Sequence, residues 1–290
     1  MSEKQIMESE TARTAEMAPK PAPVALWHRY RAPLAQVAIP AGALLIFLVL
    51  WQWYVREAAV PLYILPAPTD VAASLYNDWG ILSAALLITL KITFSALAAA
   101  LAGGVLFAIL FAESRFLELI FYPYAVVLQV TPIVAVAPLI IIYVQQTELV
   151  LLLCAFLVAF FPILSNTTQG LKSADHNLLN LFEMYGANRW QRLRLLLIPG
   201  ALPYFTIGLR IGGGLALIGA IVAEFTAGAA GEKAGLAFRI LEAGRRLNVP
   251  RLFAALLLIT FTGVVIFALT SLISHLLLRK WHESALKREN

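Results

Sequence analysis

The chain has 290 residues, of which 60% are hydrophobic and only 13% are charged, and its mean hydropathy is +0.80. A soluble domain has about 45–50% apolar and about 25% charged residues, so this composition excludes an ordinary soluble domain and indicates a protein embedded in the lipid bilayer. The net charge of +5 does not require nucleic acid, because Lys and Arg in loops between apolar segments suit an anionic cytoplasmic membrane surface. We therefore expect no nucleic-acid partner, and the single cysteine and scattered histidines predict no metal site.

The first 36 residues differ in composition from the rest of the chain. Glutamate, alanine and proline recur there, and almost no large apolar residue precedes Leu26, so this segment cannot bury a core. We expect residues 1–36 to be a disordered cytoplasmic tail and residues 37–290 to form one transmembrane domain. The apolar segment that follows the tail begins too late and is too long for a cleaved secretory signal, which favours an uncleaved first span.

Six apolar stretches are long enough to cross a bilayer as helices, which takes about 20 residues each. The sequence therefore predicts an all-α, polytopic membrane fold with spans at Val37–Val55, Ile92–Phe111, Leu119–Val144, Leu149–Leu164, Phe205–Phe225 and Leu252–Leu278. Ahead of the second span, Ile81–Lys91 is amphipathic and predicts a separate helix lying on the outer membrane surface.

The distribution of Lys and Arg predicts the orientation of these spans. With the N-terminus inside, the inner segments hold fourteen of these residues and the outer segments hold seven, while Arg210 lies within a span. Inner loops are typically the more basic ones, so we expect both termini, and with them residues 170–203, on the cytoplasmic side.

Residues 170–203 interrupt the apolar spans with a basic segment that predicts two short helices. Apolar residues at helical spacing form one face of the first helix, at Leu178, Leu181, Phe182 and Tyr185. Gly186 is suited to end that helix, and Asn188 with Gln191 three residues later is typical of the cap of a second helix. Trp190, Leu193 and Leu197 then line one side of that helix, and Pro199 and Pro203 are expected to break the chain before the next span. Two interpretations remain open from the residues alone: a loop adhering to lipid headgroups, or a docking element for another protein.

The motifs of this segment resemble the cytoplasmic EAA loop of ABC-importer permeases, within them the nitrate, sulfonate and taurine type. The matching residues are Gly186-Ala187-Asn188-Arg189-Trp190, Ile198-Pro199, Leu202-Pro203 and Gly208-Leu209-Arg210. Further stretches resemble the same family in the same order over about residues 60–285, at Leu65–Val71, Thr131–Leu139, Phe160–Thr167 and Val222–Phe225.

The resemblance implies the membrane-spanning permease subunit of a type I ABC importer in a bacterial inner membrane. Such a chain carries no cofactor; ATP and Mg²⁺ are bound by separate ABC ATPase subunits, and an extracytoplasmic substrate-binding protein delivers a small solute of the nitrate, sulfonate, taurine or vitamin-precursor class. A second permease copy, expected to be identical, completes the pathway. The coupling residues implied for this chain are Phe182, Glu183, Tyr185, Gly186, Ala187, Asn188, Arg189, Trp190 and Pro199.

This sequence departs from the family pattern at one motif. The Glu-Ala-Ala triplet of the family corresponds here to Asn180-Leu181-Phe182, and Glu183 lies three residues later. We therefore expect the acidic contact of that helix to be absent or shifted, with docking carried by apolar side chains and Arg189.

Polar groups within the spans are the candidates for the translocation path, because such groups are costly in lipid. They are Gln129, Thr131, Pro132 and Tyr143 in the third span and Arg210 and Glu224 in the fifth. Arg210 also fits a snorkelling or packing role, and Glu224 also fits a partner for Arg239, Arg245 or Arg246. The glycines of the fifth span favour close helix packing.

Two other function classes are weighed against the importer. A stand-alone secondary transporter would show inverted repeats and coupled carboxylates within its spans, and an integral membrane enzyme would show clustered catalytic groups. Neither pattern is visible in the sequence. The segment Ala234–Leu247 predicts a short helix in the outer loop, beside which we expect a binding protein to land.

Overall fold

The computed structural model describes residues 26–227 and 234–279, with side chains from residue 38 onward, and all regular elements in these ranges are helical. The chain separates into two compact units, residues 1–59 and 60–290. Most of the predicted tail, residues 1–25, lies outside the described residues. Residues 26–36, also expected to be disordered, are instead the first turns of a helix that begins before the predicted span.

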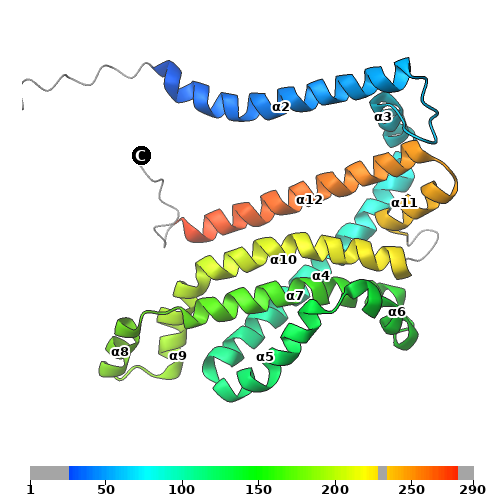
Figure 1. Cartoon of the computed structure of the whole chain (residues 1–290). Helices are drawn as coiled ribbons and strands as arrows, with labels where there is room; N and C mark the ends of the chain where they lie inside the picture. The colour runs from blue at the N-terminus through cyan, green and yellow to red at the C-terminus, as the bar shows by residue number, and fades with distance from the viewer. Residues whose placement is uncertain (1–25, 228–233, 280–290) are drawn as a thin grey trace, which may run out of the picture. The chain divides into compact units, whose positions relative to one another are not determined.

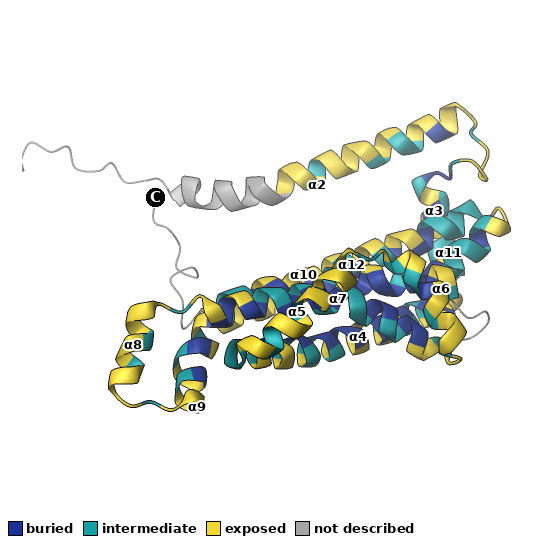
Figure 2. Cartoon of the chain, turned by 60° about the horizontal axis from the view of Figure 1, so that its bottom comes forward, coloured by how far each residue is buried: buried dark blue, intermediate teal, exposed yellow. Residues whose placement is uncertain are grey.

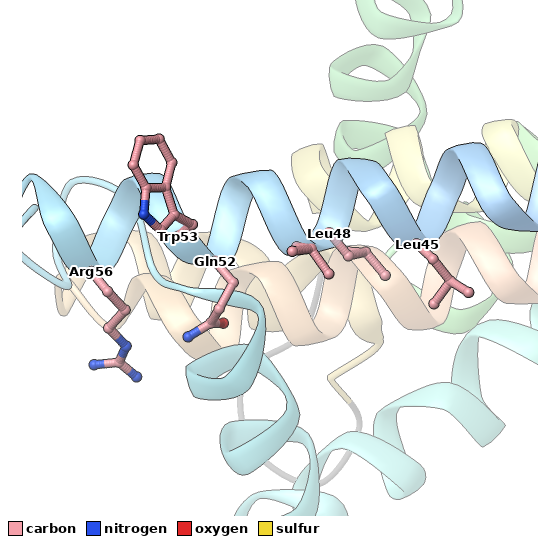
Figure 3. Close-up of a pocket in the computed structure, with 6 residues that line it drawn as sticks. Leu45, Leu48, Gln52, Trp53 and Arg56 are labelled. Carbon is pink, nitrogen blue, oxygen red and sulfur yellow. The ribbon is translucent and has the colours of Figure 1, made fainter.

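The first unit is built around helix α2 (Leu26–Glu57), whose segment Ala38–Glu57 is long and apolar enough to cross a membrane. The side chains of Leu45, Leu48, Gln52 and Arg56 project to the same side of this helix (Figure 3). The polar members of this row lie at the C-terminal end of α2, where a spanning helix meets the membrane interface.

The second unit is a bundle of long helices joined by short ones (Figure 1). In chain order these are α3 (Pro68–Asn77), α4 (Trp79–Glu113), α5 (Arg115–Val130), α6 (Ile133–Tyr143), α7 (Thr147–Lys172), α8 (His176–Met184), α9 (Arg189–Arg192), α10 (Ile198–Ala227), α11 (Leu236–Arg245) and α12 (Val249–Leu278). A π-helical turn, Leu193–Leu197, joins α9 to α10. Helices α8 and α9 lie at one end of the bundle, and α3 and α11 lie at the opposite end (Figures 1 and 2).

The core of the bundle lies between α4, α7 and α10, where small residues let the backbones approach closely (Figure 2). A Cβ atom built on Gly219 of α10 would lie 2.8 Å from the Cα of Ala155 in α7, and one built on Gly212 would lie 2.8 Å from Ile163. The close packing expected from the glycines of this helix is therefore confirmed. Gly214 is different, because a Cβ there would meet nothing within 4 Å.

The number of membrane spans agrees with the sequence prediction within the described residues. Five helical segments are long and apolar enough to cross a membrane, and the bent pair α5–α6 makes a sixth if it is one span. The third span is therefore not the single helix expected over Leu119–Val144, since α5 and α6 meet at a bend of 105°. Thr131 and Pro132 adopt extended conformations at the bend, because Pro132 has no N–H and disfavours a helical residue before it.

The predicted surface helix Ile81–Lys91 is wrong, because these residues belong to one continuous helix, α4. Lys91, which was expected to end the amphipathic stretch, lies inside α4 and has an exposed side chain with its Nζ 3.9 Å from Glu148 Oε2 of α7. The apolar residues on both sides of Lys91 continue the helical pattern. A single lysine does not end the helix, because its aliphatic stem can lie along apolar surface while the ammonium group reaches a polar environment.

The expected break at Pro199 and Pro203 is also wrong. Residues Arg189–Ala227 form one helical run, with both prolines near its start. The π-helical turn gives the physical reason, because there the N–H of Ile198 already bonds to the more distant carbonyl of Leu193. The N–H missing at Pro199 thus coincides with a change of hydrogen-bond register, where its loss costs less than inside a regular helix.

Candidate functional site

The candidate site is the elbow, which we define as residues 175–192, comprising α8, the turn Tyr185–Asn188 and α9. It projects from one end of the bundle, and its surface is largely exposed (Figure 2). The side chain of Asp175 begins α8 by accepting a hydrogen bond from the N–H of Asn177 at 2.8 Å. A short polar side chain at this position satisfies a backbone donor that a helix N-terminus leaves unpaired.

The turn between α8 and α9 has the geometry that the sequence predicts. Gly186 has a φ of +66°, a left-handed conformation that glycine adopts without steric cost. The N–H of Gly186 donates to the carbonyl of Glu183 at 2.9 Å, and the N–H of Ala187 donates to the carbonyl of Phe182 at 2.9 Å. The carbonyls at the end of α8 are thereby satisfied within the turn, which fixes its direction.

Asn188 caps α9 in the reciprocal arrangement expected from its spacing to Gln191. The N–H of Gln191 donates to the side chain of Asn188 at 2.8 Å, and the N–H of Asn188 donates to the side chain of Gln191 at 2.8 Å. Two unpaired donors are satisfied at once, so the start of α9 is well determined although the helix is short. Across the elbow, Arg192 lies 3.9 Å from Glu183, an exposed pair that contributes little to stability.

The apolar residues of the elbow and of the π-helical turn that follows it point in two directions. Leu193 and Leu197 of the π-helical turn are buried in the bundle with Phe111 and Leu164, which anchors the elbow to α4 and α7. Trp190, expected on the same side as these leucines, is instead 64% exposed, because α9 lies beyond the end of the bundle. No residue of α8 is buried; Leu179 packs partly against the bundle, whereas Leu178, Leu181 and Tyr185 of the apolar face are exposed.

That exposed face borders a shallow pocket of about 320 Å³ between α8 and α9. The pocket is lined by Leu181, Phe182, Tyr185, Ala187, Gln191 and Leu195. Tyr185 is 83% exposed and the neighbouring Met184 is 85% exposed, so large apolar groups surround a concave surface. An exposed apolar patch of this kind on a structured projection marks an interaction surface.

A charged cluster connects the bundle to the start of the elbow. Glu118 of α5 pairs with Arg115, at 2.9 Å, and with Lys172 at the end of α7. Its side chain is only 14% exposed, so the cluster is partly shielded from water. The last turn of α7 is thereby held to α5 just before the chain enters α8.

The candidate translocation residues do not form one site within the chain. Gln129, Thr131 and Pro132 lie together at the α5–α6 bend, whereas Tyr143 lies at the other end of α6 and is 84% exposed. Thr131 donates its hydroxyl to the carbonyl of Val127 at 2.7 Å.

Arg210 and Glu224 lie fourteen residues apart on α10, about 21 Å at a rise of 1.5 Å per residue. Arg210 is exposed and donates to Ser274 of α12 at 2.9 Å. Glu224 is buried and accepts hydrogen bonds from Thr89 and from the N–H of Ala237. Of the arginines considered as its partners, Arg239 and Arg246 both pair with Glu242.

Sequence reasoning missed the partners of these buried polar groups. Thr89 was not singled out, because a threonine in an apolar helix carries no signal of a bond to a residue 135 positions away. The pair between Asp78 and Arg251 was missed for the same reason, since 173 positions separate the two residues. The available signal was that Asp78 and Arg251 lie at the starts of α4 and α12, but a polar residue at a helix start does not identify its interaction partner.

The arrangement of spans and elbow agrees with the comparison to known families. The sequence model of the binding-protein-dependent transport system inner membrane component matches residues 100–283. The chain belongs to this family. It is a multi-pass permease subunit of an ABC importer for a small solute, and the alternative of a stand-alone secondary transporter is not favoured. Membership implies ATPase and binding-protein partners, and a permease component is not itself catalytic.

Curated relatives extend over most of the chain. The riboflavin transport system permease protein RibX of Chloroflexus aurantiacus is 37% identical over 248 residues, which are 83% of this chain and 89% of that protein. The formylaminopyrimidine transport permease protein ThiX of Halalkalibacterium halodurans is 30% identical, covering 84% of this chain and 96% of that protein. The taurine transport system permease protein TauC of Escherichia coli is 29% identical, with coverages of 82% and 88%.

Solved structures share the fold at lower identity. A chain of an amino acid ABC transporter crystallised with histidines superposes with a TM-score of 0.57 at 19% identity, covering 72% of this chain and 97% of that chain. A chain of the MetNI methionine ABC transporter in an inward-facing conformation gives a TM-score of 0.54 at 16% identity, with coverages of 68% and 94%. The type I importer-like fold is thereby confirmed.

Proposed function

We propose that the elbow is the docking site of a separate ABC ATPase subunit and transmits its movement to the bundle. The observation that carries this proposal is the apolar pocket between α8 and α9, on a projection joined to the bundle by the single helical run Arg189–Ala227. A helix that is continuous from the docking surface into the core can move as one body when the docked subunit moves. The partner then binds ATP with Mg²⁺ and hydrolyses the ATP.

The residues proposed to make the contact divide into two groups. Phe182, Tyr185, Ala187 and Trp190 supply apolar surface, and Glu183 and Arg189 supply charge. The backbone conformation of the elbow and of its connection to α10 depends on Gly186, Asn188 and Pro199. Asn180 is exposed at the position of the family's acidic residue, so Glu183 and Arg189 carry the charged contacts in this chain.

Co-purification tests the docking proposal. A tagged chain is expressed with its ATPase subunit, and retention of the ATPase is compared for Tyr185→Ser and Tyr76→Ser. The two tyrosines are similarly exposed, at 83% and 85%, but lie at opposite ends of the bundle. We expect Tyr185→Ser to reduce retention about tenfold, since aromatic anchors dominate such interfaces, and Tyr76→Ser to match the unsubstituted chain. Equal retention by both variants would refute the docking site.

We further propose that two identical chains form the pathway and that both termini face the cytoplasm. The excess of Lys and Arg in the segments assigned to the cytoplasm supports this orientation. Labelling with a membrane-impermeant maleimide in intact cells tests it, in a chain whose only cysteine is removed by Cys154→Ser. Tyr76→Cys should then be labelled from outside, and Tyr185→Cys only after the membrane is opened. The reverse pattern would overturn the proposed orientation.

For the cargo, we propose a heterocyclic vitamin or vitamin precursor. The relatives at 37% and 30% identity are named for riboflavin and formylaminopyrimidine transport, which supports this class over sulfonates and nitrate. Uptake of labelled riboflavin and of labelled taurine is compared in cells with and without the chain. Taurine uptake that depends on the chain, with riboflavin uptake unaffected, would contradict the proposed cargo.

A further inference from the structure

Glu224 is a buried acid near the end of α10 that lies far from the elbow. It is 1% exposed. Its Oε1 accepts a hydrogen bond from the hydroxyl of Thr89 in α4 at 2.7 Å, and its Oε2 accepts one from the N–H of Ala237 in α11 at 2.9 Å. A carboxyl group removed from water needs such partners, and here they come from two other helices.

The partners of Glu224 also define the start of α11. The N–H of Leu236 donates to the hydroxyl of Thr89 at 2.9 Å, so the first two N–H groups of α11 are satisfied by Thr89 and Glu224. A helix usually receives these bonds from its own N-cap side chain. The N-cap of α11 is Gly235, which has no side chain to supply them.

The packing at Gly235 explains why a side chain is absent there. A Cβ atom built on Gly235 would lie 2.1 Å from Oε1 of Glu224, so the carboxyl group occupies the space that an ordinary capping side chain would fill. The carboxyl oxygens lie at the N-terminus of α11, where backbone N–H groups without an intrahelical partner need acceptors. The cap of α11 is therefore donated by α10, with Thr89 of α4 as its second part.

We infer that Glu224 and Thr89 are positioning residues that fix the start of α11 to α10 and α4, so that α11 follows the movement of α10. The helical run that begins at Arg189 in the elbow ends at Ala227, one turn beyond Glu224, at the opposite end of the bundle (Figure 1). That the movement of α10 originates at a docked ATPase rests on the proposed function. The attachment of α11 to α10 and α4 rests only on the hydrogen bonds of Glu224 and Thr89.

Hydrogen–deuterium exchange of the purified full chain tests the attachment. Thr89→Val keeps the shape of the side chain but removes the hydroxyl, and Thr93→Val is its matched control. Thr93 is equally buried one turn along the same helix, and its hydroxyl bonds only within α4, to the carbonyl of Thr89 at 2.8 Å. We expect exchange at Leu236 and Ala237 to rise at least about tenfold in Thr89→Val, because the substitution removes the hydroxyl's hydrogen bonds to Leu236 and to Glu224. The control should leave it unchanged, and unchanged exchange in Thr89→Val would refute the attachment.

Transport by the reconstituted complex, with its ATPase and binding protein, tests the consequence. We expect Thr89→Val and Glu224→Gln to lower ATP-driven uptake about tenfold while ATP hydrolysis continues, and Thr89→Ser, which keeps the hydroxyl, to restore uptake. Uptake unaffected by Thr89→Val despite faster exchange would overturn the positioning role, as would a parallel loss of uptake and hydrolysis. If the unsubstituted complex shows no ATP-driven uptake, the proposed function fails, and the exchange measurement still decides whether Glu224 and Thr89 hold α11.

Discussion

Arg251 and Asp78 form a two-pronged ion pair at the end of the bundle opposite the elbow. Nε of Arg251 lies 2.9 Å from one carboxylate oxygen of Asp78, and Nη2 lies 2.6 Å from the other. Ser74 of α3 donates a further hydrogen bond to the same carboxylate at 2.8 Å. Because both charged side chains are about four-fifths covered, this pair ties α12 to the start of α4 more firmly than an exposed pair would.

Removal of the guanidinium should therefore destabilise this end of the bundle. For Arg251→Ala we expect a loss of about 2 kcal/mol in the free energy of unfolding, because Asp78 keeps its charge but loses its main donors. Arg251→Lys should recover only part of the lost stability, since an ammonium group cannot bond both carboxylate oxygens of Asp78 in the planar geometry of a guanidinium. Thermal unfolding of the purified chain in detergent measures both. Arg245→Ala is the control, because Arg245 is exposed, and an equal loss there would contradict the role of the pair.

The pair of Arg251 and Asp78 also predicts how the stability of the folded chain changes with pH. The hydrogen bonds donated by the Arg251 guanidinium hold the pKa of Asp78 below its ordinary value of 3.8, even though partial burial acts in the opposite direction. A lowered pKa in the folded chain means that the stabilisation is complete above the unfolded-state value and is lost as pH falls through the folded-state value.

Thermal stability measured between pH 7 and pH 3 checks this sign. The unsubstituted chain and Asp78→Asn should differ most near neutral pH, and the difference should shrink only below about pH 4. A difference that instead grew as pH fell would show that the folded state raises the pKa of Asp78.

The contact between α7 and α10 predicts opposite effects for two glycines of the same helix. Gly219→Ala should destabilise the chain by about 1–3 kcal/mol, because the new methyl group would press on the backbone of Ala155. Gly214→Ala should be neutral or stabilising by up to about 1 kcal/mol, since the new atom meets open space and glycine is unfavourable inside a helix. Unfolding of the two variants in one detergent compares them directly, and equal stabilities would argue against the packing.

The turn of the elbow predicts a change in coupling without a change in bundle stability. Gly186→Ala should strain the turn by about 1–2 kcal/mol, because the left-handed conformation crowds a Cβ atom. We expect weaker retention of the ATPase subunit at a nearly unchanged melting temperature of the bundle, because the exposed turn can relax its strain locally. Gly200→Ala, inside α10 and also facing open space, should retain the ATPase fully. Retention lost equally in both variants would show that the turn geometry is not the cause.

Features set by neighbouring residues could be predicted from the sequence. The cap at Asn188 and the end of α8 at Gly186 depend on side chains and backbone groups within four positions, and both predictions are confirmed. The identity of the family followed from motifs in the same region. The use of these residues for docking remains a prediction, because docking depends on a second protein.

Features set by distant residues could not be predicted. Pro199 normally ends a helix, and only the π-helical turn before it explains why the helix continues. Glu224 was expected to line the translocation path or to pair with an arginine, whereas its partners come from α4 and from the backbone of α11. Pairings of this kind depend on how the helices pack, which one sequence does not state.

The π-helical turn has a consequence for how this permease can diverge. A π turn amounts to one extra residue in an α-helix, and each residue of an α-helix advances its azimuth by about 100°. The wide turn absorbs that extra residue, so deleting one residue from Leu193–Leu197 should restore a regular α-helix without the rotation of about 100° that a deletion inside a regular α-helix would impose on the elbow. A single-codon deletion at this turn should therefore leave the direction of the elbow nearly unchanged, whereas the same deletion elsewhere in α10 should not.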